Sequence, residues 1–267
     1  MHSTLLTATL LLGAAQSALA QSSDQCRHEA HRTANVDAAG ARLLTVKAGA
    51  GSLRIEGKAG LDRVVIRGRA CASDARLLEE IELRANRRGS DVVVEATARV
   101  EGWSFTGMRY ASLDLVIEVP ARMAAEIADG SGSIDISNLG AVGITDGSGE
   151  ITGSDLHGDV RIQDGSGGIK LTNLAGAVNI HDGSGSIELR NIGGLIDITD
   201  GSGEIDVRTA RNSVRISDGS GGIEVADVDG DFTVTRGGSG GIGYSNVKGR
   251  VDIPSRRGRR GRRSEAL

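Results

Sequence analysis

The segment DGSGGIKLTNLAGAVNIH, residues 164–181, decides the fold because its pattern returns along the second half of the chain. The tetrapeptide Asp-Gly-Ser-Gly opens six copies, which begin at Asp129, Asp146, Asp164, Asp182, Asp200 and Asp218. A degenerate seventh copy begins at Gly237, and the steps between copies are 17, 18, 18, 18, 18 and 19 residues. A fixed period of this length predicts a solenoid of stacked coils and not an ordinary globular core.

Each period contains two short stretches in which apolar and polar residues alternate, as half-buried strands require. In the copy at 164–181, Ile169 and Leu171 mark the first strand, and Val178 and Ile180 mark the second. Because one coil cannot bury such a face alone, we expect the coils to stack about 4.8 Å apart. The predicted columns include Ile134, Ile151, Ile169, Ile187, Ile205, Ile223 and Ile242 on the first strand, and Ile144, Ile162, Ile180, Ile198, Ile216, Val234 and Ile253 on the second.

The corner between the two strands has its own repeated chemistry. Its apolar column is Leu139, Leu156, Leu174, Ile192, Ala210, Val228 and Val247, and the residue before it is Asn or Asp in every copy except the one with Thr209. These amide and carboxylate side chains are predicted to bond backbone groups at the turn and to form ladders between coils. Two residues after the apolar position, most copies carry glycine and one carries Asn212, which predicts a positive φ there.

Residues 1–20 predict a cleaved signal peptide, with an apolar run from Leu5 to Leu12 and the small-residue ending Ala18-Leu19-Ala20. Nothing after residue 20 is apolar for long enough to span a membrane as a helix. We therefore expect an exported bacterial protein that is periplasmic, on the outer surface or secreted. The two cysteines, Cys26 and Cys71, favour one disulfide over a redox pair or part of a metal site.

Residues 21–128 keep the alternation but blur the period, for example in Leu53-Arg54-Ile55 and in Val92-Val93-Val94. We expect wider, irregular coils that cap the N-terminal end, because an open first coil would expose strand edges. The stretch from Trp103 to Tyr110 gathers most of the large side chains, and both a loop over the end of the core and an exposed recognition patch fit it. The regular repeats are predicted to occupy residues 129–253.

Residues 254–267 form a basic tail, predicted to be disordered, with arginine at Arg256, Arg257, Arg259, Arg260, Arg262 and Arg263. Six arginines and one glutamate contribute +5, so the formal charge of −4 becomes −9 without the tail. One hypothesis is attachment to an anionic surface such as lipopolysaccharide, anionic lipid or extracellular nucleic acid. The other is a solvated tail that keeps the last coil from pairing with another molecule.

Stacking would also place the six repeat aspartates in a column, each carboxylate about 5 Å from the next, on what we expect to be the outer side of the coils. At that spacing neighbouring charges repel by roughly 1 kcal/mol in water and about 3 kcal/mol at an effective dielectric constant of 20. Two arrangements would offset the repulsion. Each aspartate could accept bonds from the amides of its own Gly-Ser-Gly turn, or the column Asp129, Asp146, Asp164, Asp182, Asp200 and Asp218 could bind cations, for which calcium suits oxygen ligands.

An enzyme acting on polysaccharides is the main alternative, because β-helices can carry such sites. A catalytic site needs a few unlike residues converging on one groove, whereas these coils are nearly identical. His157 and His181 are isolated in the sequence, and neither a Gly-x-Ser-x-Gly nor a His-Glu-x-x-His motif occurs. The sequence therefore predicts no catalytic residues and no small-molecule substrate.

The order of motifs carries a family resemblance over nearly the whole mature chain. Gly49-Ala50-Gly51-Ser52-Leu53, then Val64-Val65-Ile66, then Leu115 to Pro120, then repeated Asp-Gly-Ser-Gly-x-Ile resembles the bacterial adhesin-like family with β-strand repeats, related to the auto-transporter adhesin head domain. The resemblance implies an all-β, single-stranded right-handed parallel β-helix in the cell envelope, with about 18 residues per coil and no catalytic residues. Unlike an autotransporter, this chain ends in the arginine tail. The expected function is a non-enzymatic interaction or structural module whose partner in the envelope is unknown.

Overall fold

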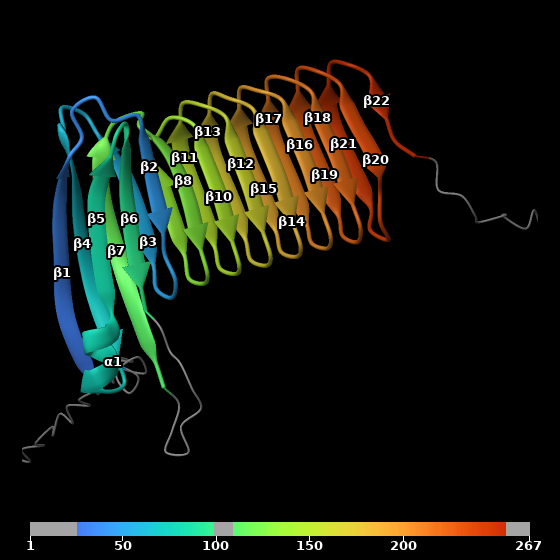
Figure 1. Cartoon of the computed structure of the whole chain (residues 1–267). Coiled ribbons are helices and arrows are strands. Elements are labelled where there is room, and N and C mark those ends of the chain that lie inside the picture. The colour runs from blue at the N-terminus through green and yellow to red at the C-terminus, as the bar shows by residue number, and fades with distance from the viewer. Residues whose placement is uncertain (1–25, 99–108, 255–267) are drawn as a thin grey trace, which may run out of the picture.

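The structure, a computed structural model, describes residues 26–98 and 109–254 and consists almost entirely of β-strands (Figure 1). The strands form two sheets of eleven strands each, and the buried apolar side chains of the core lie between them. A coil contributes one strand to each sheet, so the repeat is a flattened solenoid with two strands per coil. The solenoid predicted from the period is therefore confirmed.

The first sheet runs β1-β4-β7-β3-β9-β11-β13-β15-β17-β19-β21, and the second runs β22-β20-β18-β16-β14-β12-β10-β8-β2-β6-β5. The regular strands of the first sheet are β9 (Ile134–Ser137), β11 (Ile151–Leu156), β13 (Ile169–Leu174), β15 (Ile187–Ile192), β17 (Ile205–Ala210), β19 (Ile223–Val228) and β21 (Ile242–Val247). Those of the second sheet are β8 (Ala124–Asp129), β10 (Val142–Asp146), β12 (Val160–Asp164), β14 (Val178–Asp182), β16 (Ile196–Asp200), β18 (Val214–Asp218), β20 (Phe232–Arg236) and β22 (Val251–Asp252).

Equivalent residues of successive coils lie directly beside one another in parallel register. Ile169 pairs with Ile187, and Ile187 pairs with Ile205, and each is no more than 1% exposed. Ile162 and Ile180 are paired and buried in the same way in the second sheet. The predicted aliphatic columns are thus continuous seams through the core. Only the last coil departs from full burial, since its members are partly exposed.

The N-terminal end is covered, as expected, but by antiparallel strands and not by wide coils. β1 (His28–Asp37) pairs with β4 (Arg63–Ala72), which pairs with β7 (Ala111–Pro120), and β5 (Glu82–Arg88) forms an antiparallel pair with β6 (Asp91–Thr97). A short helix, α1 (Ala75–Glu80), precedes β5, and the carboxylate of Asp74 caps it by accepting the N–H groups of Arg76 and Leu77 at 3.0 Å. The sequence analysis did not predict this helix.

One regular coil lies outside the period that begins at Asp129. β2 (Leu43–Lys47) lies between β6 and β8, and β3 (Leu53–Lys58) lies between β7 and β9, all in parallel pairs. Its turn resembles the others, because Ala50 bridges to Ser131 and Gly51 has a φ of 130°. The spatial order of the coils therefore differs from their order in the chain, and the cap strands are inserted between two coils that stack directly.

At the corner between the strands, the prediction of positive φ at the glycine column is wrong. The left-handed residues are the corner Asn and Asp side chains that precede the apolar position, with φ of 51–61°, and Thr209 at 62°. The glycine is required by space instead: a Cβ on Gly176 would lie 2.3 Å from the carbonyl oxygen of Gly158 in the preceding coil. The predicted side-chain ladder is confirmed, because Asn191 Nδ2 donates to Asn173 Oδ1 at 2.9 Å.

The last glycine of each Asp-Gly-Ser-Gly turn has a φ that other residues rarely adopt. At Gly167, φ is 148°, and a Cβ would lie 1.7 Å from the carbonyl oxygen of Gly149 in the coil before it. Glycine is therefore needed here for both conformation and close approach between coils.

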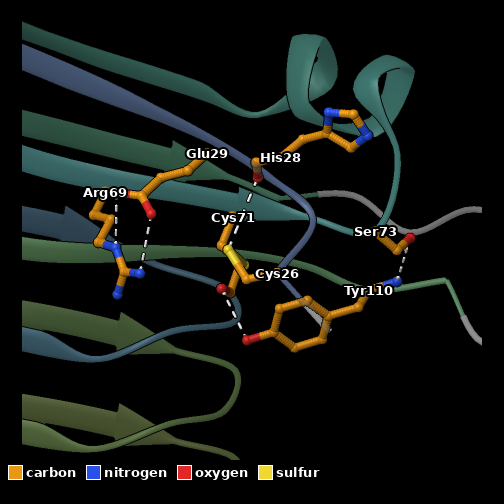
Figure 2. The surroundings of a disulfide bond; sticks show 8 residues. Cys26, His28, Glu29, Arg69, Cys71, Ser73 and Tyr110 are labelled. Atoms are coloured by element: carbon orange, nitrogen blue, oxygen red, sulfur yellow. Dashed lines mark hydrogen bonds and ion pairs between the residues drawn. A yellow bond between two sulfur atoms is a disulfide. The ribbon is translucent and has the colours of Figure 1, made fainter. Parts of the chain in front are cut away.

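The predicted disulfide is present (Figure 2). Cys26 and Cys71 are joined with their Cα atoms 5.3 Å apart, and the bond ties the chain before β1 to the end of β4. Near it, Arg69 Nε lies 3.0 Å from a carboxylate oxygen of Glu29. The bond and this ion pair hold the first strand onto the cap.

At the opposite end the solenoid is open within the described residues. β21 and β22 are the edge strands of the two sheets, and Tyr244 is 52% exposed. Phe232 packs against the Tyr244 ring, with centroids 6.1 Å apart. No helix among the described residues is both long and apolar enough to cross a membrane. The predicted signal peptide at 1–20 and the arginine tail from residue 255 onward lie outside the described residues.

Candidate functional site

The repeat aspartates face the interior, so the expectation of an outer column is wrong. Each is the last residue of a strand in the second sheet and continues its inward-facing set, as in Val178, Ile180 and Asp182 of β14. All six are buried, with exposures of 8, 5, 7, 7, 4 and 1% for Asp129, Asp146, Asp164, Asp182, Asp200 and Asp218. We call these six residues the aspartate column.

The column is continuous because the register places each aspartate beside the next. Asp146 pairs with Asp129 and with Asp164, and Asp182 pairs with Asp164 and with Asp200. Neighbouring strands of a sheet lie about 4.8 Å apart. The stack therefore brings six acidic side chains into one buried row at the corner of the solenoid.

One oxygen of each inner aspartate is bonded by its own turn, as predicted. The Oδ1 atoms of Asp164, Asp182, Asp200 and Asp218 accept the N–H of the serine two residues on, at 3.3, 3.2, 3.1 and 2.9 Å. The Oδ2 atoms of these four residues are buried and have no hydrogen-bond partner among the described residues, and both carboxylate oxygens of Asp129 and Asp146 share this condition. An unpaired buried carboxylate oxygen is costly, which points to a proton or a ligand between the coils.

Burial raises the pKa of these carboxyl groups. Burial, together with the charge of neighbouring aspartates and against the opposing turn amides, raises the pKa of Asp129 to about 7 and that of Asp200 to about 6. The pKa values of Asp146, Asp164 and Asp182 are also raised, chiefly by burial. Protonation lowers the cost of burying these carboxylates, because a shared proton both neutralises a charge and lets one carboxyl group donate to its neighbour's unpaired oxygen.

Calcium binding by the column stays a prediction. Calcium takes six to eight oxygen ligands in an open cage, whereas each aspartate here offers only one or two unbonded carboxylate oxygens to a narrow interior. Across residues 26–98 and 109–254, no group of three or more His, Cys, Asp or Glu side chains is placed to hold one metal ion.

The outer face of the first sheet carries a row of ion pairs, some within a strand and some between coils. Lys170 Nζ lies 3.5 Å from a Glu188 carboxylate oxygen, Glu188 also contacts Arg190, and Arg208 Nε lies 2.9 Å from Asp206 Oδ1. These side chains are exposed to solvent, so each pair contributes little to stability.

The two histidines singled out in the sequence do not lie together. His157 and His181 are exposed and come from different corners of the coil, and His157 Nε2 lies 3.2 Å from Asn138 Oδ1. Arg256 to Arg263 and the greater part of the stretch from Trp103 to Tyr110 lie outside the described residues. The sequence analysis did not predict that the aspartates face the interior. The signal was present, because each Asp follows two apolar residues at the same two-residue spacing and therefore shares their side of the strand.

No family model matches the sequence, and no curated protein matches it. Several solved structures are similar in shape. A "putative cell adhesion protein" from Clostridium sporogenes is 14% identical with a TM-score of 0.37, and the match covers 85% of this chain and 98% of that one. A "putative adhesin" from Bacteroides fragilis is 12% identical with a TM-score of 0.39, covering 85% and 98%. A "putative lipid binding protein" from Parabacteroides distasonis is 16% identical with a TM-score of 0.43, covering 84% and 96%. Identities and scores this low do not transfer a function.

Proposed function

We propose that the protein is an exported, non-enzymatic β-solenoid that acts as an adhesin-like interaction module of the bacterial cell envelope. The observation that carries this proposal is the stack of near-identical coils, which repeats the same outward-facing positions at every step in both sheets. Such a body presents long flat faces, a shape suited to binding extended surfaces. A catalytic site would need unlike residues converging on one place.

Export is supported by the disulfide. Cys26 and Cys71 are the only cysteines of the chain, and they are bonded to each other. Disulfides of this structural kind persist in the periplasm or outside the cell, because the cytosol keeps thiols reduced. The signal-like residues 1–20 point the same way.

The arginine tail extends the proposal to an anionic partner. It begins after Pro254, next to the open end of the solenoid, and it carries six arginines against one glutamate. We propose that the tail holds this end against an anionic surface, while the acidic remainder of the chain stays in solvent.

The experiment is a binding assay of the purified mature chain with outer-envelope fractions, with and without residues 255–267. We expect saturable binding that the truncated chain loses in part and that salt weakens. A matched control variant leaves the solenoid unchanged and replaces the six arginines of the tail with glutamine. Envelope binding that is absent from the full chain would contradict the proposal, and cleavage of envelope polysaccharides abolished by a single substitution would favour an enzyme instead.

A further inference from the structure

The outer face of the second sheet carries a groove that is separate from the aspartate column and contains no residue of the arginine tail. It has a volume of about 410 Å³ and crosses strands β8, β10, β12, β14 and β16. Its floor contains small residues, Ala141, Gly143 and Ala177, and Leu195, which is 45% exposed, forms an apolar wall. Ligand pockets commonly have volumes of about 300–1,000 Å³, so this hollow is large enough for a small ligand or for part of a chain.

A row of polar side chains lines the groove in direct register. Gly143 lies between Glu126 and Arg161, and Arg161 is followed by Asn179 and then Asp197, one residue per coil. Glu126 reaches over its glycine neighbour, because a Cβ added to Gly143 would lie 2.2 Å from Glu126 Oε2. The glycine therefore makes room for the carboxylate beside the groove.

The polar side chains of this row are free, unlike Lys170 and Glu188 on the opposite face. Within the described part of the chain, the side chains of Glu126, Arg161, Asn179 and Asp197 make no hydrogen bond or ion pair. On the first sheet, by contrast, Lys170 pairs with Glu188 of the next coil, and Glu188 pairs with Arg190 of its own strand. This row therefore offers side-chain donors and acceptors that no other group in the described part of the chain engages.

The chemistry of the groove limits the class of ligand that it can bind. Its backbone amides and carbonyls are used in the parallel ladders, so a ligand can bond only to side chains, which disfavours a peptide added as an extra strand. Three acids, Glu126, Asp159 and Asp197, and one base, Arg161, give the lining a charge of −3 + 1 = −2, which disfavours anionic polymers. A neutral polyhydroxylated chain offers both donors and acceptors at short, regular intervals, which fits a row with one polar group every 4.8 Å or so.

We propose that this groove binds a neutral linear glycan, whose hydroxyl groups bond to Arg161, Asn179 and Asp197 on successive coils while its less polar face rests on Ala177 and Leu195. The inference rests on the proposed envelope-binding function and names the ligand class of one of its faces. Because the lining contains no aromatic ring for stacking, the affinity of a single site is expected to be millimolar, and strength would come from multivalent attachment.

The test uses the mature chain and ligand-observed NMR with four probes, namely maltotetraose, cellotetraose, chitotetraose and the anionic tetragalacturonate. We expect at least one neutral tetrasaccharide to bind. Asn179→Ala and Asp197→Ala should each weaken that binding by about fivefold, the equivalent of one hydrogen bond. Ala177→Leu should also weaken it by filling the floor, and the fold tolerates leucine there because Leu195 occupies the equivalent place in the next coil. Thr172→Ala on the first sheet is the matched control and should change nothing.

The proposal would be overturned if no neutral tetrasaccharide binds, or if binding is unchanged in all three groove variants. It would also be overturned if tetragalacturonate alone binds and the chain without residues 255–267 no longer binds tetragalacturonate. Far-ultraviolet circular dichroism and urea midpoints of each variant establish that the solenoid is intact. The envelope-binding assay is run on the same variants. A chain that still binds envelope fractions but no neutral tetrasaccharide would refute the glycan site alone, whereas loss of envelope binding by the unmodified chain would refute the proposed function.

Discussion

Replacing Asp200 with asparagine should stabilise the solenoid near neutral pH. Asparagine keeps the oxygen that accepts the Ser202 N–H, has the same shape, and cannot ionise inside the aspartate column. Its amide can also donate to the unpaired carboxylate oxygen of a neighbouring coil. The usual result of a substitution at a buried polar site is destabilisation, so a gain in stability here would be specific evidence for a charge held at a cost.

The magnitude follows from the raised pKa of Asp200. The pKa is about 6 in the folded chain against 3.8 for an ordinary aspartate, which corresponds to about 3 kcal/mol at 1.36 kcal/mol per unit. Because the folded state binds the proton more tightly than the unfolded chain, stability is fully present below pH 3.8 and is lost as the pH rises through about 6. Asp200→Asn should therefore raise the free energy of unfolding by up to about 3 kcal/mol above pH 6, and the gain should shrink towards zero as the pH falls below 4.

Urea unfolding of the full chain, at about pH 4 and about pH 7.5, measures this effect through the midpoint and its slope. Asp197→Asn is the matched control, because it makes the same change on the outer face of the same strand and should shift the midpoint little at either pH. An Asp200→Asn midpoint that falls at pH 7.5, or that rises equally at both pH values, would refute the reasoning.

Four further predictions concern the turns, the disulfide and the metal hypothesis. Gly167→Ala should destabilise the chain by at least about 3 kcal/mol or prevent folding, whereas Gly168→Ala, with 3.6 Å to its nearest neighbour, should cost less than about 1 kcal/mol in urea unfolding. Thr209→Asn should raise the melting temperature by relieving a β-branched residue at a φ of 62°, a gain of about 1 kcal/mol, and an unchanged melting temperature would argue against strain there. Reduction of Cys26 and Cys71, which close a loop of 45 residues, should lower stability by about 2–4 kcal/mol, as measured by unfolding with and without reductant. Calcium binding by the aspartate column predicts a higher melting temperature in millimolar calcium, and no shift would remove that hypothesis.

The stacking of coils could be predicted from the sequence because the period sets the register. With Ile169, Ile187 and Ile205 each 18 residues apart, any shift by one residue would turn the apolar positions outward. The disulfide could also be predicted, since an exported chain with two cysteines has one possible pair. The corner ladder followed from the recurrence of Asn and Asp, such as Asn173 and Asn191, at one place in every coil.

The side of the coil on which the aspartates lie was predicted wrongly because charged residues are nearly always found at the surface. The alternation Val178, Ile180, Asp182 pointed inward, and the N–H of Ser184 bonds one oxygen of the buried Asp182 carboxylate. The positive φ was also assigned to the wrong corner residue. Glycine can be required by conformation or by space, and the sequence alone does not separate these reasons at Gly176.

The arrangement of the N-terminal coils could not be read from the period, because strand pairing there does not follow chain order. β3 pairs directly with β9, although the cap strands β4 to β7 separate the two along the chain. The turn before β3 contains Ala50 in place of serine, so the repeat signature is absent there. The groove was equally hidden. It depends on Glu126, Gly143 and Arg161 lying side by side, and a list of outward residues does not show which of them remain unpaired.

The most direct test of the central claim, that the repeat aspartates form a buried column inside the solenoid, is a pH titration of the aspartate ¹³Cγ signals by NMR, assigned with single Asp→Asn variants. The account predicts that Asp129 titrates at about 7 and Asp200 at about 6, both well above the ordinary aspartate value of 3.8. Titration of both residues at the ordinary value of 3.8 would place their carboxylates in solvent and would contradict it.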